Sequence, residues 1–191
     1  MKLGDIATVR SGLVLARKKA KADEGIYYPL LNLRSINSGG YIETDELDAY
    51  YSSEYLPPEY LTHVGDIVVR LTAPYTAILI DDNTENIVVS SNFIIIRINS
   101  AKYLPEYLYW LFNTKDIKHS IYENATSNML GAVKAKYFSD FKIKPISLSD
   151  QEIISELNRL AKRESYLLMK LAEEKEKYYE AIIHNVQKKM R

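Results

Sequence analysis

Short apolar runs separated by turn residues make up most of the first 145 positions of the chain. The runs are rich in valine and isoleucine, whose branched side chains suit a pleated surface. An aspartate and an asparagine between two of the runs are typical of a turn. The pattern predicts strands over four segments: Ile26–Leu33, Asp66–Leu71, Ala77–Ile80 and Ile87–Ile98.

Other segments of this first part carry helical or weaker signals. Apolar residues recur every three positions from Leu3 to Val9, which predicts a short helix that ends at Gly12. Pro105 stands where a first-turn proline belongs, and apolar residues follow it at helical spacing. A last strand is expected near Tyr137–Ile143.

After Pro145 the pattern changes to one long helix. The segment Ser149-Asp150-Gln151-Glu152 reads as a capping box, in which Ser149 and Glu152 satisfy each other's backbone amides. No proline or glycine follows Pro145, so no residue interrupts the helix. About 40 residues at ~1.5 Å each predict a rod of ~60 Å.

This helix carries an apolar stripe with a seven-residue repeat, which Glu164 and Glu174 interrupt. A rod of this length cannot bury the whole stripe on the first part of the chain, and each leucine left exposed forgoes ~1.5 to 3 kcal/mol. We therefore expect a partner helix, either a second copy, parallel or antiparallel, or a similar helix of another protein. A hairpin within the chain would need turn residues that are missing. The expected interface residues are Ile153, Leu157, Leu160, Leu167, Leu171 and Tyr178.

Composition narrows the class of protein. The chain has 191 residues, of which 47% are apolar, so it can form one domain with an extension. It contains no cysteine, which excludes disulfides and thiolate zinc sites, and its three histidines are scattered. No apolar run approaches the ~20 residues that span a bilayer, and no secretion signal is present, so a cytoplasmic protein without membrane contact is expected.

Charge is balanced in total but segregated along the chain. The 25 basic and 25 acidic residues give a formal net charge of zero. Basic residues predominate among the charged residues from Arg10 to Lys21 and from Lys134 to Lys144, whereas the charged residues between Arg34 and Arg70 are all acidic. Two basic runs on one face would attract a phosphate backbone. The alternative is that these lysines only keep loops solvated.

Signals for catalysis are weak. Phosphate-binding glycine loops, a nucleophile elbow and an adenine-methyltransferase motif are all missing, so no catalytic residue, metal site or cofactor is expected. Asp140 and Lys142 on the expected last strand, with Asp116 upstream, match an acid-x-lysine nuclease pattern. Such short matches often arise by chance. The nuclease hypothesis and a protein-binding adaptor are the alternatives to DNA binding.

Five segments stand out in this order along the chain: Leu3–Ala7 with Arg10–Gly12, Tyr28–Arg34, Gly65–Arg70, Pro105–Leu111 and Pro145–Gln151. Together they resemble the target recognition domain of specificity subunits from Type I restriction-modification systems. One departure is that the junction has Pro-Ile-Ser-Leu-Ser-Asp-Gln where the family has Pro-Pro-Leu-x-x-Gln. A second is that the family usually carries two recognition domains and two spacer helices, whereas this chain resembles one of each.

The resemblance implies an α+β fold: a mixed-sheet target recognition domain over residues 1–146 and a spacer and dimerisation helix over 147–191, paired with an antiparallel partner helix. It implies a non-catalytic subunit that reads half of a bipartite site in double-stranded DNA. Modification methyltransferase subunits, and in some complexes a restriction subunit, would dock on it. Two identical halves would form a homodimer and read a symmetric interrupted target.

Residue roles follow from this expectation. Strand-end and loop residues are expected to reach base edges, and cations in the two basic runs to contact phosphates. For Arg34 and Arg70 the alternative is an ion pair with the acidic stretch between them, and for Thr72 to Tyr75 it is a simple turn. The expected phosphate contacts are Arg10, Arg17, Lys18, Lys19, Lys134 and Lys136. The expected base contacts are Arg34, Arg70, Thr72, Tyr75 and Asn128.

Overall fold

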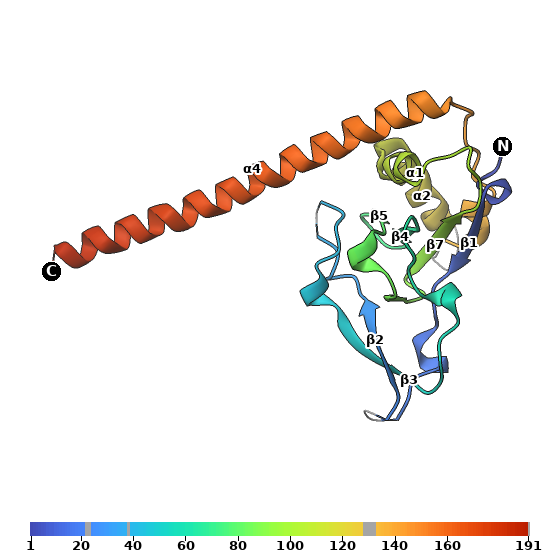
Figure 1. Ribbon diagram of the computed structural model, residues 1–191, viewed down its shortest axis with the longest axis horizontal. Helices are drawn as coiled ribbons and strands as arrows, with labels where there is room; N and C mark the ends of the chain where they lie inside the picture. The colour runs from blue at the N-terminus through green and yellow to red at the C-terminus, as the bar shows by residue number, and fades with distance from the viewer. Residues whose placement is uncertain (22–23, 38, 128–132, 191) are drawn as a thin grey trace. The chain divides into compact units, whose positions relative to one another are not determined.

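The computed structural model describes residues 1–21, 24–37, 39–127 and 133–190 (Figure 1). The chain forms two compact units, Met1–Ile154 and Ser155–Arg191. The first unit contains both sheets, the shorter helices and the start of the long helix α4, and the second unit is the remainder of α4. We describe each unit by itself.

The central element of the first unit is a four-stranded sheet in the order β1-β7-β4-β5, with all neighbours antiparallel. Val68 of β4 lies between Ile95 of β7 and Ile78 of β5. Runs of β-branched residues form these strands because their side chains pack well on a pleated surface. The strands are β1 (Ala7–Ser11), β4 (Ile67–Arg70), β5 (Ala77–Leu79) and β7 (Phe93–Ile98).

A second sheet has three strands in the order β3-β2-β6. Strand β2 is antiparallel to β3 and parallel to β6, so this sheet is mixed. Among the described residues of the unit, five 3₁₀ turns lie before or between the strands. The strands are β2 (Ile26–Leu31), β3 (Asp48–Ser52) and β6 (Val88–Val89). The turns are η1 (Leu3–Asp5), η2 (Leu15–Arg17), η3 (Thr44–Glu46), η4 (Pro58–Tyr60) and η5 (Asp82–Thr84).

Both faces of the four-stranded sheet are buried, and alternate residues serve opposite layers. On one face, Ile67, Val69 and Ile94 pack with the three short helices. On the other face, Val68 and Ile95 pack with residues of the second sheet. Figure 1 shows this order of layers in the first unit, with α1 and α2 on one side of the central sheet and β2 and β3 on the other. The helices are α1 (Pro105–Asn113), α2 (Lys115–Ser127) and α3 (Ala135–Ser139).

Three predicted elements differ from the observed ones. The expected first helix is only the turn η1, and Val9 lies in strand β1. The run Ile87–Ile98 divides into β6 and β7, which belong to different sheets. The last expected strand, Tyr137–Ile143, is wrong because its first residues form helix α3, with Phe138 fully buried. A short apolar run has the same composition in a buried helix as in a strand.

Helix α4 (Leu148–Lys189) runs for 42 residues without a break, as the pattern predicts. The residues that cap it differ from the prediction. The Ser147 hydroxyl accepts a hydrogen bond from the Asp150 amide at 3.1 Å and donates one to the Asp150 carboxylate at 2.6 Å. The predicted pair Ser149 and Glu152 lies inside the first turns, because the helix begins at Leu148.

The long helix, the antiparallel four-stranded sheet and the mixed three-stranded sheet confirm the predicted α+β fold class, whereas a partner for α4 remains a prediction. Within the described residues, every helix is too short or too polar to span a bilayer.

Candidate nucleic-acid interface

One end of the four-stranded sheet gathers several of the predicted DNA contacts. Strands β1 and β4 both end beside the start of β7, where Ser11 pairs with Ile94 and Arg70 pairs with Phe93. Arg10, at the end of β1, therefore lies at the same end of the sheet as Arg70. The connection from β4 to β5, which carries Thr72 and Tyr75, starts at this edge.

Hydrogen bonds order the β4–β5 connection. The Arg70 Nε donates to the Thr72 hydroxyl at 2.9 Å, and the Tyr75 amide donates to the Thr72 carbonyl at 2.9 Å. Tyr75 has a φ of 55°, in the left-handed region, and the Ala73–Pro74 bond is cis. Arg70 makes no ion pair with the described residues. The loop therefore presents the Thr72 hydroxyl and an Arg70 guanidinium whose charge is not neutralised by a described acid.

The acidic stretch neutralises three other predicted contacts. Arg10 pairs with Glu59 at 2.8 Å, and the Lys18 Nζ lies 2.6 Å from a Glu54 oxygen. Arg34 pairs with Asp48 and more distantly with Glu46, so the ion-pair alternative applies to this residue. These pairs lie at the surface, where solvent screens the attraction between the charges. A phosphate can therefore replace the acid at little cost.

The two basic runs belong to different layers of the unit. The first run lies against the second sheet, because the Ser53 amide, next to the end of β3, donates to the Lys18 carbonyl at 2.8 Å. The second run begins helix α3, which packs on the opposite, helix-covered face of the four-stranded sheet. Arg17, Lys19, Lys134 and Lys136 are exposed, and none of the described acids forms an ion pair with them. Asn128 lies outside the described residues.

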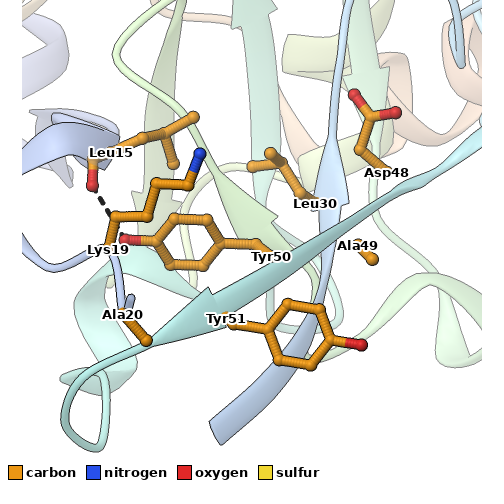
Figure 2. Close-up of a pocket in the computed structure, with 8 residues that line it drawn as sticks. All are labelled: Leu15, Lys19, Ala20, Leu30, Asp48, Ala49, Tyr50 and Tyr51. Carbon is orange, nitrogen blue, oxygen red and sulfur yellow. Dashed lines mark hydrogen bonds between the residues drawn. The ribbon is translucent and has the colours of Figure 1, made fainter. Parts of the chain in front are cut away.

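A pocket of about 570 Å³ lies where the first basic run meets the second sheet (Figure 2). Its lining includes Lys19, Asp48 and the rings of Tyr50 and Tyr51. The Tyr50 hydroxyl donates to the Leu15 carbonyl at 2.9 Å, and burial raises the pKa of this phenol. The pocket places one predicted cation beside aromatic rings and contains no arrangement of nucleophile and base.

Sequence reasoning missed a buried ion pair in the same unit. Asp66 is fully buried and receives both Arg97 Nε at 2.8 Å and Arg97 Nη2 at 2.7 Å. The same Nη2 donates to the Leu61 carbonyl at 3.0 Å, and the His63 amide donates to Asp66 at 2.9 Å. The hydrogen bond to Asp66 is the main cause that raises the pKa of Arg97. The sequence did contain one signal for this ion pair: Arg97 is a charged residue within the otherwise apolar end of the run Ile87–Ile98.

Gln151 was missed as a structural residue, although it lies in the junction segment. Its side chain is fully buried and bonds three backbone groups. The Leu104 amide donates to Oε1 at 2.9 Å, and Nε2 donates to the carbonyls of Lys102 at 2.9 Å and Ile146 at 3.2 Å. This side chain joins the first turn of α4 to the start of α1.

The nuclease pattern does not form a strand-borne site. Asp140 follows helix α3, and its exposed carboxylate pairs with the Lys2 Nζ at 2.7 Å. That hydrogen bond lowers the pKa of Asp140. In the part of the chain that the structure describes, no group of three histidines or acids can hold a metal ion.

The sequence model of the Type I restriction modification DNA specificity domain matches residues 1–174. The chain belongs to this family. No curated protein sequence matches it significantly. The predicted resemblance is confirmed, and with it the assignment as a specificity domain.

Solved structures of this family share the fold at low sequence identity. The HsdS subunit from Thermoanaerobacter tengcongensis has a TM-score of 0.64 and 18% identity over 87% of this chain. A chain from a structure of complex assembly and conformational transition in the type I R-M system has a TM-score of 0.64 and 16% identity over 87%. The S subunit from M. genitalium has a TM-score of 0.50 and 13% identity over 86%.

The chain spans about two fifths of the length of these relatives, since the alignments cover 43%, 42% and 38% of their chains.

Two glycines in the segments that resemble the family are required by the fold. Gly12 passes so close to the β6–β7 connection that a Cβ atom would lie 2.2 Å from the Ser90 carbonyl oxygen. Gly65 has a φ of +84°, which favours glycine. At these two positions the segments reflect requirements of the fold.

Proposed function

We propose that this chain reads one half of a bipartite site in double-stranded DNA for a type I restriction-modification enzyme and that it has no catalytic activity of its own. The observation that carries the proposal is the match of the specificity-domain family over residues 1–174. In this role the protein would work with DNA in the cytoplasm. Modification methyltransferase subunits are the proposed partners, joined by a restriction subunit in complexes that cut.

The end of the four-stranded sheet is the proposed reading surface. Arg70 carries a guanidinium that no described acid neutralises, and arginine pairs in bidentate fashion with guanine. Thr72 and Tyr75 lie in the same connection and supply further hydrogen-bonding groups. Arg10 is proposed to exchange its ion pair with Glu59 for a phosphate.

The remaining predicted cations are proposed to hold the backbone on either side. Arg17, Lys18 and Lys19 precede the second sheet, and Lys134 and Lys136 begin α3. Their positions in different layers support two separate phosphate contacts rather than one continuous basic face. Asn128 and Arg34 remain proposed base contacts, the latter in competition with its ion pair to Asp48.

The exposed stripe of α4 supports pairing with a second copy. The six predicted interface residues are between 50% and 62% exposed. Burying a leucine side chain gains about 1.5 to 3 kcal/mol, so several such residues favour association strongly. Two paired copies would carry two recognition domains and read two half-sites. The six residues are Ile153, Leu157, Leu160, Leu167, Leu171 and Tyr178.

The test is selection of bound sequences from a random duplex pool, followed by titration of the selected duplex at several salt concentrations. We expect an interrupted consensus and an affinity that falls steeply with salt. Arg70→Ala should lose about 1–3 kcal/mol and relax the preference at one position. Arg17→Ala should weaken all sequences alike and reduce the salt slope by about 1.

Arg159→Ala is the matched control. Arg159 is an exposed residue of α4 that pairs with Glu156, so this substitution removes the same charge at a site away from the proposed reading surface. A chain that binds no duplex at low salt, yet captures a protein partner, would contradict the proposal and favour the adaptor alternative. Metal-dependent cutting by the purified chain would favour the nuclease alternative.

A further inference from the structure

The exposed apolar residues of α4 follow an eleven-residue repeat more closely than the expected heptad. In the heptad, Glu164, Glu174 and Asn185 interrupt the stripe. Eleven residues make about three turns at ~3.67 residues per turn, so such a stripe stays on one face of a nearly straight helix. Three positions of the repeat are apolar each time: Leu157, Leu168 and Tyr179; Leu160, Leu171 and Ile182; Ala161, Ala172 and Ile183.

The fourth position of the repeat carries the only charges of the stripe. It is occupied by Ile153, Glu164, Lys175 and Val186 in turn. Glu164 lies in a shallow apolar depression of the helix surface, together with Leu160 and Leu168. Neither Glu164 nor Lys175 forms an ion pair with the described residues of the chain.

Some charged residues outside the stripe are paired locally. Arg159 bonds Glu156 at 2.6 Å, and Lys177 bonds Glu174 at 2.7 Å. The two stripe charges are set apart from these pairs by their position among the apolar residues of the stripe. Their opposite signs and their spacing of one repeat suggest complementary partners on another helix.

We propose that a second copy of this chain lies antiparallel along the stripe, centred between positions 169 and 170, so that Glu164 of each copy faces Lys175 of the other. The inference rests on the proposed pairing of two copies, takes the antiparallel direction from the family resemblance and adds the register. The two-fold axis makes the charge pair occur twice.

The same register matches apolar residues at most heights of the stripe, with the exception of Ile183, which lies at the height of Glu156 of the partner subunit. Leu168 lies at the height of Leu171 of the partner subunit. Leu160 lies at the height of Tyr179 of the partner subunit, and Ile153 lies at the height of Val186 of the partner subunit. Only the fourth position of the repeat places charges opposite each other in this seam.

Other arrangements place like charges together. A shift of one repeat in either direction sets Glu164 opposite its own copy or Lys175 opposite its own copy. A parallel pair in register does both at once. Like charges in a seam disfavour an alternative partner arrangement, which is how polar residues select register in helix pairs.

The register also fixes a span. The two copies of Gln151, the residue that joins α4 to the first unit, would lie roughly 55 Å apart along the helix axis at ~1.5 Å per residue. This exceeds one helical turn of DNA, ~34 Å, so the paired helices can separate two half-sites.

Cysteine cross-linking tests the register, because the chain contains no cysteine of its own. We expect an equimolar mixture of Leu160→Cys and Tyr179→Cys to form a disulfide-linked dimer on mild oxidation. Each variant alone should not cross-link, because its two cysteines would lie roughly 28 Å apart along the axis. A cross-link in Leu160→Cys alone would show parallel pairing and overturn the proposal.

Charge exchange tests the pair itself. Glu164→Lys and Lys175→Glu should each weaken dimerisation about tenfold or more, measured by sedimentation equilibrium, because each replaces two attractive contacts with repulsive ones. Mixing these two variants should restore dimers, and so should the double variant. Glu173→Lys, on the opposite side of the helix and paired only with Lys170, is the control and should dimerise normally.

The outcomes separate this inference from the proposed function. Dimers that tolerate both exchanges equally overturn the register, while the pairing remains. A chain that stays monomeric at tens of micromolar overturns the pairing and the register together. A chain that dimerises as expected but ignores DNA in the selection experiment leaves the register standing and refutes the recognition function.

Discussion

Replacing Gln151 with alanine should loosen the contact between the first turn of α4 and the segment before α1, both within the first unit. The side chain is fully buried and holds three backbone groups at 2.9, 2.9 and 3.2 Å. One of them is the Leu104 amide, immediately before helix α1. Alanine removes the side-chain partners, and the small residue leaves no group that can replace them.

The expected cost follows from those contacts. A buried backbone group left without a partner costs about 1–3 kcal/mol, and the two carbonyls recover part of this through their second lone pairs or water. We therefore expect a loss of about 3 kcal/mol in the free energy of unfolding of the first unit. For a chain of this size, that corresponds to a melting temperature lower by about 6 to 12 °C.

The only tryptophan, Trp110, lies in α1 and packs against Tyr107, so its fluorescence reports unfolding of the first unit. Thermal and urea unfolding of Gln151→Ala should be compared with Glu152→Ala, which changes the exposed neighbouring residue. Gln151→Met keeps the length of the side chain and removes its polar atoms, so it should remain destabilised. If Gln151→Ala unfolds within 0.5 kcal/mol of Glu152→Ala, a limit typical of surface changes, the contact contributes nothing measurable.

Three further changes test the fold. Gly12→Ala should destabilise the first unit by several kcal/mol, measured by urea unfolding, because its Cβ would meet a backbone oxygen at 2.2 Å. Asp66→Asn leaves Arg97 without its buried carboxylate and should cost about 3–5 kcal/mol in the same assay; a loss below 1 kcal/mol would contradict the pairing. Ser147→Ala should cost about 1 kcal/mol and Ser149→Ala almost nothing, and the reverse order would restore the originally predicted cap.

The prediction of the last strand shows where pattern reasoning fails. Tyr137 and Phe138 suit a strand in composition, but the segment is a short helix whose Phe138 packs with Phe112. The choice between the two depends on the space left by α1 and the sheet, which no local pattern contains. The division of Ile87–Ile98 at Ser90 has the same cause, since β6 and β7 pair with different neighbours.

The candidate contacts divide in a similar way. Local sequence placed Arg10 in a basic run, as an expected phosphate contact, and Arg34 and Arg70 at strand ends, as expected base contacts. Pairing across the fold distinguishes them, because Glu59 and Asp48 approach the first two and no described acid approaches the third. Ion pairs between residues 14 to 49 positions apart cannot be deduced from charge runs alone.

The long helix and its unburied stripe followed from the amino-acid pattern, because the helical period, a polar cap and the lack of glycine or proline are local properties. Family membership was also readable there, since its segments stand in order along the chain. The assignment of strands to two sheets, the burial of Asp66 with Arg97 and the role of Gln151 arose from folding. These features depend on which distant backbone and side-chain groups must satisfy one another once water is excluded.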